Sequence, residues 1–312
     1  MPRSQRGVGA LLLLLAAALA SCAPDPRSPG TTDRAADHPA ARIVALSPHL
    51  TELVFAAGAG AKLVGVVEFS NHPLAAQVLP RVGDAFHLDF EALAAARPDL
   101  VLGWPSGNSP RTLDRLRRLG YRVVDLEPGT LDDLGSQIGT IGALAGTESA
   151  ARPAAAAWRS GLESLRSRYA GVPPVRVFYQ VAPQPLITVT ARHFIGQAIE
   201  LCGGRNVFAD VPGLSPVVGA EAVVTAAPEV IVASDFTRVP GAVVTGSPLD
   251  RWRSWLRIPA VANGRLAVID PDLMSVPGPR LLDGIARLCK AISPEGSAAK
   301  KRAGTTGPFL ED

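Results

Sequence analysis

The sequence lacks several features that mark common classes of enzymes and nucleic-acid-binding proteins. Aromatic residues make up only 5% of the chain, and no basic stripe is interleaved with them, so nucleic acid is a poor candidate partner. The chain has no Gly-rich phosphate loop, no Cys-x-x-Cys pair and no Ser-His-Asp constellation. Its five histidines are scattered, and we assign none of them to a metal. We therefore expect neither a catalytic residue nor a bound cofactor.

The N-terminal segment has the parts of an export signal. Arg3 and Arg6 give a charged start, residues 11–19 form an apolar core too short to cross a bilayer, and small residues precede Cys22. This arrangement resembles a bacterial lipoprotein signal, in which Cys22 becomes the lipidated first residue of the mature protein. The alternative is an ordinary secretory signal in which Cys22 is incidental. We expect an exported lipoprotein of the cell envelope that faces the periplasm and is attached to the membrane by lipid.

Two cysteines remain once Cys22 is assigned to the lipid. Cys202 and Cys289 both fall in helices expected late in the chain, and export places them in an oxidising compartment. A disulfide between them would contribute roughly 4–5 kcal/mol in the loop-entropy model. The alternative is two buried free thiols, and export favours the disulfide.

A long helix in the middle of the chain, residues 147–171, organises the expected fold. Its apolar residues recur at helical spacing and form one stripe: Trp158, Leu162, Leu165 and Tyr169. We expect Thr147 to cap the helix and Gly171 to end it. Pro153 either kinks the helix or lies in its first turn. Such a helix would extend roughly 35 Å and would act as a rigid strut between two lobes.

A repeated pattern on either side of this helix supports two lobes. Each copy has a glutamate, a short apolar helix, a proline, an acid and an apolar strand, at a constant offset of 130 residues. The matching residues are Glu91, Pro98 and Asp99 in the first copy and Glu221, Pro228 and Glu229 in the second. The pattern indicates a duplicated lobe.

Strand and helix patterns alternate in both halves, which predicts mostly parallel α/β sheets. Strands are expected at 42–46, 62–67, 99–103, 122–126, 175–181, 229–233 and 265–269. Helices are expected at 48–58, 111–119, 131–144, 194–201, 221–225, 249–255 and 280–292. The expected division is a signal peptide at 1–21, a disordered tether at 22–41, an N-terminal lobe at 42–146, a linking helix at 147–171, a C-terminal lobe at 172–292 and a disordered tail at 293–312.

Ligands of parallel α/β sheets bind beyond the carboxyl ends of the strands, so the residues after each strand are the candidates for a site. They offer aromatic faces, amides, hydroxyls and peptide groups, with few convergent acids or bases: residues 47–49, 69–72, 104–108, 180–185, 235–237 and 272–275. This chemistry favours a binding cleft over a catalytic one.

Four motifs together resemble the cobalamin (vitamin B12) receptors of bacterial ABC importers: Arg42 to Pro48, Thr51-Glu52, Pro98 to Val101, and Leu201 to Phe208. The similarity runs from about Ala41 to Ile292, and several motifs are shared by the wider family of helical-backbone receptors for haem and iron-siderophores. The resemblance implies a class III periplasmic binding protein, with two Rossmann-like lobes joined by a rigid helix, and it implies that Cys202 and Cys289 are paired. We expect a monomer that captures cobalamin or a related corrinoid between the lobes and delivers it to a membrane permease and its ATPase.

The resemblance also assigns ligand contacts. Phe69 stands where the family has a stacking tyrosine, and Trp104 matches a pocket tryptophan, although a core tryptophan is the alternative. Family aromatics are missing near Ala85 and at Ser215, and Phe86 could replace the first. On the second lobe the implied contacts are Asp272, for which a turn residue is the alternative, and the loop residues Leu273, Met274, Ser275 and Val276.

Glu91 and Glu221 match the two family glutamates, one in each lobe, that meet arginines of the permease. The alternative for each is an acid favoured by the dipole at a helix N-terminus. Because they are related by the repeat, we favour docking, where the charges would set register and steer association.

Two rival functions stay open. The first is a receptor for haem or an iron-siderophore, which a cluster of arginines or tyrosines facing the cleft would favour. The second is an envelope enzyme such as a metal chelatase, which would need a histidine and an acid with shifted pKa values in the cleft.

Overall fold

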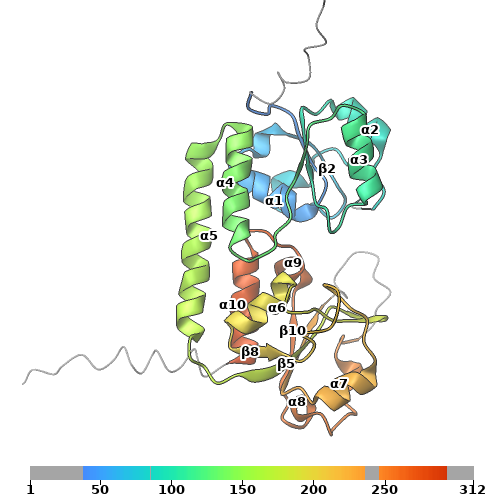
Figure 1. Ribbon diagram of the computed structural model, residues 1–312, viewed down its shortest axis with the longest axis vertical. Coiled ribbons are helices and arrows are strands. Elements are labelled where there is room, and N and C mark those ends of the chain that lie inside the picture. Colours follow the sequence, from blue (N-terminus) through green and yellow to red (C-terminus); the bar gives the residue numbers. More distant parts are fainter. Residues whose placement is uncertain (1–37, 85, 236–245, 294–312) are drawn as a thin grey trace, which may run out of the picture. The chain divides into compact units, whose positions relative to one another are not determined.

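The computed structural model describes residues 38–84, 86–235 and 246–293 (Figure 1). The predicted signal peptide, Cys22, most of the tether and the tail from residue 294 lie outside the described residues. All the elements described below belong to one compact unit that begins at Pro39. Within the described ranges, no helix has the length and apolarity needed to cross a membrane.

The N-terminal lobe is a parallel sheet with the strand order β2-β1-β3-β4. Its strands are β1 (Ile43–Ala45), β2 (Leu63–Val66), β3 (Leu100–Gly103) and β4 (Val123–Asp125). Its helices are α1 (Pro48–Ala56), α2 (Phe90–Ala96), α3 (Pro110–Arg118) and α4 (Asp133–Ala145), with 3-10 turns η1 (Gly60–Lys62) and η2 (Leu74–Ala76). Successive strand residues enter different cores: Leu100 and Leu102 pack with α1 and α4, whereas Val101 packs with α2 and α3. The sheet is therefore covered on both faces, as the buried strands predict.

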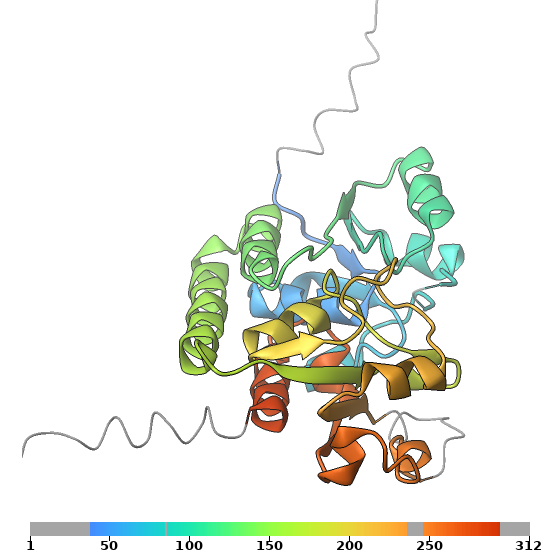
Figure 2. The same cartoon turned by 60° about the horizontal axis from the view of Figure 1, so that its bottom comes forward.

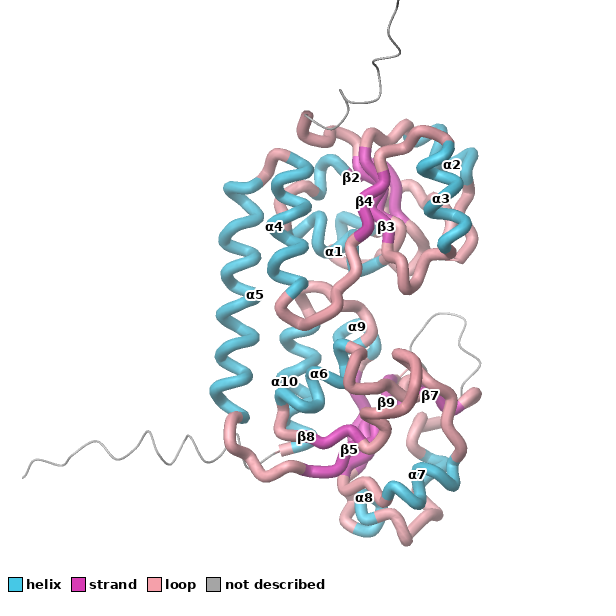
Figure 3. The backbone as a smooth tube through the Cα atoms, in the orientation of Figure 1, coloured by secondary structure: helices cyan, strands magenta, loops and turns pink. Residues whose placement is uncertain are grey.

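The C-terminal lobe has its own parallel sheet, with the order β10-β9-β5-β8, and Figure 3 shows the two sheets as separate groups of strands. Its strands are β5 (Val175–Gln180), β8 (Gly204–Asn206), β9 (Val230–Ser234) and β10 (Leu266–Ile269), with a small antiparallel pair β6 (Ala182–Pro183) and β7 (Leu186–Ile187). Its helical elements are α6 (Phe194–Leu201), α7 (Ala220–Ala226), η4 (Asp250–Trp252), α8 (Pro259–Ala262), α9 (Pro271–Met274) and α10 (Leu281–Ile292). The two-lobed α/β fold class expected from the sequence is confirmed.

The repeat at an offset of 130 has the same local structure in both lobes. Helices α2 and α7 end on Arg97 (φ 44°, ψ 57°) and Ala227 (φ 45°, ψ 58°), both left-handed although neither is glycine. The acid that follows holds the first strand of its lobe: Asp99 accepts from the Arg42 amide at 3.0 Å, and Glu229 accepts from the Arg176 amide at 3.0 Å. Because the helix end, the acid and the strand recur together, the two lobes share one framework.

The long helix α5 (Glu148–Tyr169) lies beside α4 in both views (Figures 1 and 2) and also contacts α10 of the other lobe. The helix continues through Pro153. Its C-cap is Ala170, one residue before Gly171, where the sequence placed the end of the helix. The Thr147 side chain was expected to cap the helix, but its hydroxyl donates to Ala57 O at 2.7 Å and so ties the helix start to α1. The apolar stripe through Trp158 and Tyr169 is buried as predicted.

Cys202, which follows α6, and Cys289 of α10 form a disulfide, as predicted. Both residues are fully buried in the same core that receives α5. The bond joins two helices of the C-terminal lobe across 87 residues of sequence, so it restricts the unfolded chain over most of that lobe.

Several local predictions were wrong. The helix expected at 249–255 is only the short 3-10 turn η4, because the Trp252 indole is buried and donates to Gln180 Oε1 at 2.8 Å, which holds the turn against β5. Helices α8 and α9 were not predicted, although each begins with a proline at its first turn. Strands β6, β7 and β8 are too short to give a periodic pattern.

We predict opposite effects for two alanine substitutions in α4. A methyl group at Gly142 would lie 2.4 Å from Ala151 Cβ of α5, so Gly142→Ala should lower the free energy of unfolding by about 1–3 kcal/mol through overpacking. Gly139 faces open space, so Gly139→Ala should raise that free energy by up to about 1 kcal/mol through helix propensity. Denaturant unfolding of both variants measures the difference, and equal effects would show that α4 and α5 are not packed this closely.

Candidate functional site

A cavity of about 490 Å³ lies where loops of the two lobes meet, a size typical of small-molecule sites. The N-terminal lobe contributes the residues after β3 and β4: Trp104, Pro105, Ser106, Glu127, Pro128 and Gly129. The C-terminal lobe contributes the turn into α6 and two loop residues: Arg192, His193, Phe194, Leu214 and Pro277. The N-terminal wall thus follows the carboxyl ends of two parallel strands, where the rule for such sheets places a ligand.

The turn that carries Trp104 is fixed to the sheet by one asparagine. The Trp104 amide donates to Asn108 Oδ1 at 2.7 Å, and Asn108 Nδ2 donates to Leu46 O at the end of β1 at 2.9 Å. A methyl group at Gly107 would lie 2.0 Å from the Trp104 ring, so only glycine lets the indole lie over its own turn. The ring is therefore held in place before any ligand binds.

His49 supports the Trp104 ring from within the lobe. The two rings meet edge to face, with centroids 5.0 Å apart and an interplanar angle of 82°. His49 is 2% exposed, and its Nδ1 lies 2.8 Å from the Ser47 hydroxyl. Burial lowers the pKa of His49 to about 3, so the ring is neutral around pH 7.

The facing wall is built by the residue before α6. His193 Nδ1 accepts the Ile195 amide at 3.1 Å and so caps the helix, while its ring packs on Phe194 with centroids 4.3 Å apart. Burial lowers the pKa of His193 to about 4. In the sequence, His193 is one of several scattered histidines, and no role was predicted for it. Its position directly before the helix expected at 194–201 is the sequence signal for a capping residue.

Glu127 was also missed, and it closes the N-terminal wall beside Trp104. Its carboxylate accepts the Ser106 amide at 2.8 Å and the Ser106 hydroxyl at 2.9 Å. These two hydrogen bonds connect the turn after β3 with the loop after β4. The sequence places Glu127 directly after a predicted strand, but the strand-end residues chosen there did not include it.

Of the predicted ligand contacts, Trp104 lines the cavity. Phe69 and Phe86 are 59% and 74% exposed and lie outside the cavity lining. Asp272 is exposed, whereas Leu273, Ser275 and Val276 are half-buried beside the lining residue Pro277. Met274 does not line the cavity: its side chain is fully buried in the core, with Sδ against Gly284, because α9 turns it inward. The ligand contacts assigned to these residues stay predictions.

The two predicted docking glutamates occupy equivalent places. Glu91 and Glu221 lie in the first turns of α2 and α7, and both are exposed. Asp89 caps α2 by accepting the amides of Glu91 and Ala92, so the Glu91 carboxylate is not needed as a cap. Their role in docking stays a prediction.

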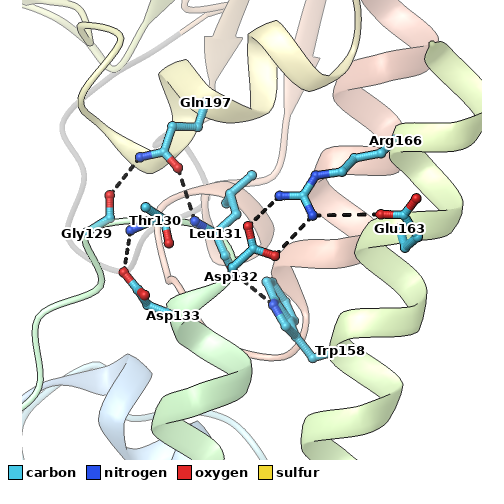
Figure 4. Close-up of polar contacts among 9 residues, drawn as sticks. All are labelled: Gly129, Thr130, Leu131, Asp132, Asp133, Trp158, Glu163, Arg166 and Gln197. Carbon is cyan, nitrogen blue, oxygen red and sulfur yellow. Dashed lines mark hydrogen bonds and ion pairs between the residues drawn. The ribbon is translucent and has the colours of Figure 1, made fainter.

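The loop between β4 and α4 ties the cavity to both lobes (Figure 4). Gln197 of α6 donates to Gly129 O at 2.8 Å and accepts from the Leu131 amide at 3.1 Å. Trp158 of α5 donates to Leu131 O at 2.8 Å. Arg166 of α5 binds both carboxylate oxygens of Asp132, at 3.0 and 2.5 Å, and this hydrogen bonding lowers the Asp132 pKa.

A second connection between the lobes is an ion pair. Arg280 Nε lies 3.2 Å from each carboxylate oxygen of Glu52, and Arg280 Nη2 lies 2.5 Å from Oε1. Glu52 is only 5% exposed and the Arg280 side chain is 25% exposed, so the pair joins α1 to the start of α10 with the carboxylate buried and the guanidinium partly open to solvent. In the part of the chain that the structure describes, no group of three or more His, Cys, Asp or Glu is placed to hold a metal ion.

The chain is similar in sequence to a known protein family and to named members of it. Residues 43–273 match the family model described as periplasmic binding protein. The vitamin B12-binding protein of Vibrio cholerae (strain O395) is 36% identical over 252 residues, which cover 80% of this chain and 88% of that protein. The corresponding protein of Yersinia pestis is 34% identical over 258 residues, covering 81% and 87%.

Solved structures show the same fold. The periplasmic vitamin B12-binding protein BtuF of Vibrio cholerae aligns with a TM-score of 0.74 and 35% identity, covering 82% of this chain and 98% of that one. A periplasmic haem-binding protein of Pseudomonas aeruginosa aligns with a TM-score of 0.68 and 28% identity, covering 82% and 93%.

Burial of His49 predicts that the protein loses stability in mild acid. Because the folded pKa of His49 lies below the unfolded value of 6.5, the unfolded state binds the proton more readily, and stability should fall as pH drops from 6.5 towards 3. His49→Gln cannot take up this proton, so its Tm should fall less steeply over the same range. The measurement is Tm against pH for both proteins, and parallel curves would show that His49 does not contribute.

Proposed function

The chain belongs to the periplasmic binding protein family, and on this premise we propose that it binds cobalamin or a related corrinoid and delivers it to an ABC importer. Members of this family are substrate-binding proteins rather than enzymes, and so is this chain. The observation that carries the proposal is the cavity bounded by the Trp104 turn of one lobe and the His193-Phe194 segment of the other. The names of the relatives from Vibrio cholerae and Yersinia pestis support the choice of ligand.

The walls of the cavity suit a flat, largely apolar ligand. Its lining is mostly apolar, with the Trp104 indole on one side and Phe194 and Leu214 on the other. Affinity would come from burial of the ligand's apolar faces, and the few polar groups would set its orientation. No bond of the ligand changes in this function.

Attachment and delivery belong to the same proposal. Cys22 would carry the lipid and the segment to residue 41 would act as a tether, so that the monomeric receptor stays near the periplasmic face of the membrane. Glu91 and Glu221 would meet basic residues of the permease, whose ATPase drives import. The support for docking is that these two exposed acids occupy equivalent helix starts in the two lobes.

A haem receptor is the second candidate. It is favoured by the haem-binding protein of Pseudomonas aeruginosa, which shares the fold at 28% identity. Calorimetry of the signal-free protein against cobalamin, cobinamide, haemin and ferric siderophores distinguishes the candidates. Tight binding of haemin alone would replace the corrinoid proposal.

Trp104→Ala should weaken corrinoid binding by roughly 1–3 kcal/mol, because the indole would lose its stacked area on the ligand. Trp255→Ala is a matched control, since Trp255 is 38% exposed and does not line the cavity. The dissociation constants come from calorimetry. An unchanged constant for Trp104→Ala would remove this ring from the site.

Changing Glu91 and Glu221 together to Ala should abolish uptake through the importer and leave corrinoid affinity in solution intact. Two other exposed acids, Glu148 and Glu200, provide a control double variant that loses the same charge elsewhere. Uptake of labelled corrinoid into vesicles that contain the importer is the measurement. If affinity fell as far as uptake, the two glutamates would belong to ligand binding and not to docking.

A further inference from the structure

The ionisable side chains that line the cavity differ in kind between its two walls. Glu127 on the N-terminal wall has a carboxylate, which accepts hydrogen bonds when ionised and donates none. Arg192 and His193 on the C-terminal wall supply donors. Among the described residues, no cation forms an ion pair with Glu127 within 4.0 Å.

His193 is held as a donor by the helix that it caps. Its Nδ1 is the acceptor for the Ile195 amide, so in the neutral ring the proton resides on Nε2. Contact with Phe194 fixes the plane of the ring. His193 lines the cavity and its N–H donor is therefore on Nε2, and binding a metal through Nε2 would require it to lose this proton.

Arg192 balances the charge of Glu127. The arginine is exposed and donates from Nη2 to Gly213 O at 3.2 Å, which leaves further N–H groups of the guanidinium for a ligand. With one carboxylate, one guanidinium and a neutral imidazole, the lining carries no net charge. It therefore presents acceptors and donors without a net attraction for an anion.

On the premise of the proposed function, we propose that Glu127, Arg192 and His193 make the cavity selective for macrocycles whose peripheral groups are neutral amides over those that carry carboxylates. Amide side chains around such a ring can donate N–H groups to Glu127 on one wall and accept from Arg192 and His193 on the other. A carboxylate can use only the donor wall, and it is repelled by Glu127. The two walls thus match a ligand whose peripheral groups both donate and accept hydrogen bonds.

Two corrinoids with one ring system test this selectivity. Cobinamide carries its ring side chains as amides, and cobyrinic acid carries them as carboxylic acids. The signal-free protein should bind cobinamide more tightly in calorimetry at pH 7. Equal affinity for cobinamide and cobyrinic acid would contradict the proposed selectivity but not corrinoid binding. Binding of neither corrinoid would contradict the proposed function as well as the selectivity.

Substitutions with opposite charge effects sharpen the test. Glu127→Gln should reduce the preference for the amide ligand, and Arg192→Gln should increase it, each by about two- to fivefold as for exposed charge pairs. His193→Ser keeps the helix cap but removes the imidazole donor, so it should weaken cobinamide binding about two- to twelvefold. His193→Asn provides a second capping variant if the serine variant folds poorly.

Shifts in the same direction for Glu127→Gln and Arg192→Gln would overturn the charge argument. Unchanged cobinamide affinity in both His193 variants would show that the His193 imidazole does not donate to the ligand. A change in the visible spectrum of a bound aquocorrinoid that disappears in His193→Ser would show that this histidine ligates the metal, which contradicts the assignment of its Nε2 proton.

Discussion

The cavity depends on the attachment of one loop to two helices, through three side chains. The loop from Gly129 to Asp132 leaves β4 of the N-terminal lobe, and it is bonded to Gln197 of α6 and to Trp158 and Arg166 of α5 (Figure 4). Pro128 and Gly129 are part of the cavity wall. One wall of the N-terminal lobe is therefore bonded to the C-terminal lobe through Gln197.

The ion pair between Glu52 and Arg280 strengthens this constraint. Removing Arg280 would leave the buried Glu52 carboxylate uncompensated, which costs far more than loss of an exposed pair. Together with α5, which packs on α4 and α10, the pair connects the two lobes at more than one point. A cavity formed between such walls can be pre-shaped for its ligand, which lowers the entropy lost on binding.

The sequence predicts the framework well because the framework depends on local patterns. The repeat, the long apolar stripe and the two late cysteines identify the lobes, α5 and the disulfide. The cavity was harder to predict because its walls are loops brought together by packing. Glu127 and His193 lie 66 residues apart, and no periodicity connects them. Met274 was assigned to a loop, but Pro271 starts a short helix that turns this side chain into the core.

The duplication is retained in the framework and lost at the cavity. Trp104 is related by the offset of 130 to Ser234, which is buried and bonded to the Tyr179 hydroxyl at 2.9 Å instead of facing a ligand. At the helix starts of α2 and α7, by contrast, both lobes keep an exposed glutamate. An asymmetric ligand requires walls that differ, whereas a transporter made of two similar halves requires surfaces that match. The repeat therefore keeps the two exposed acids and has diverged at the cavity, which is the pattern that the proposed binding and docking roles require.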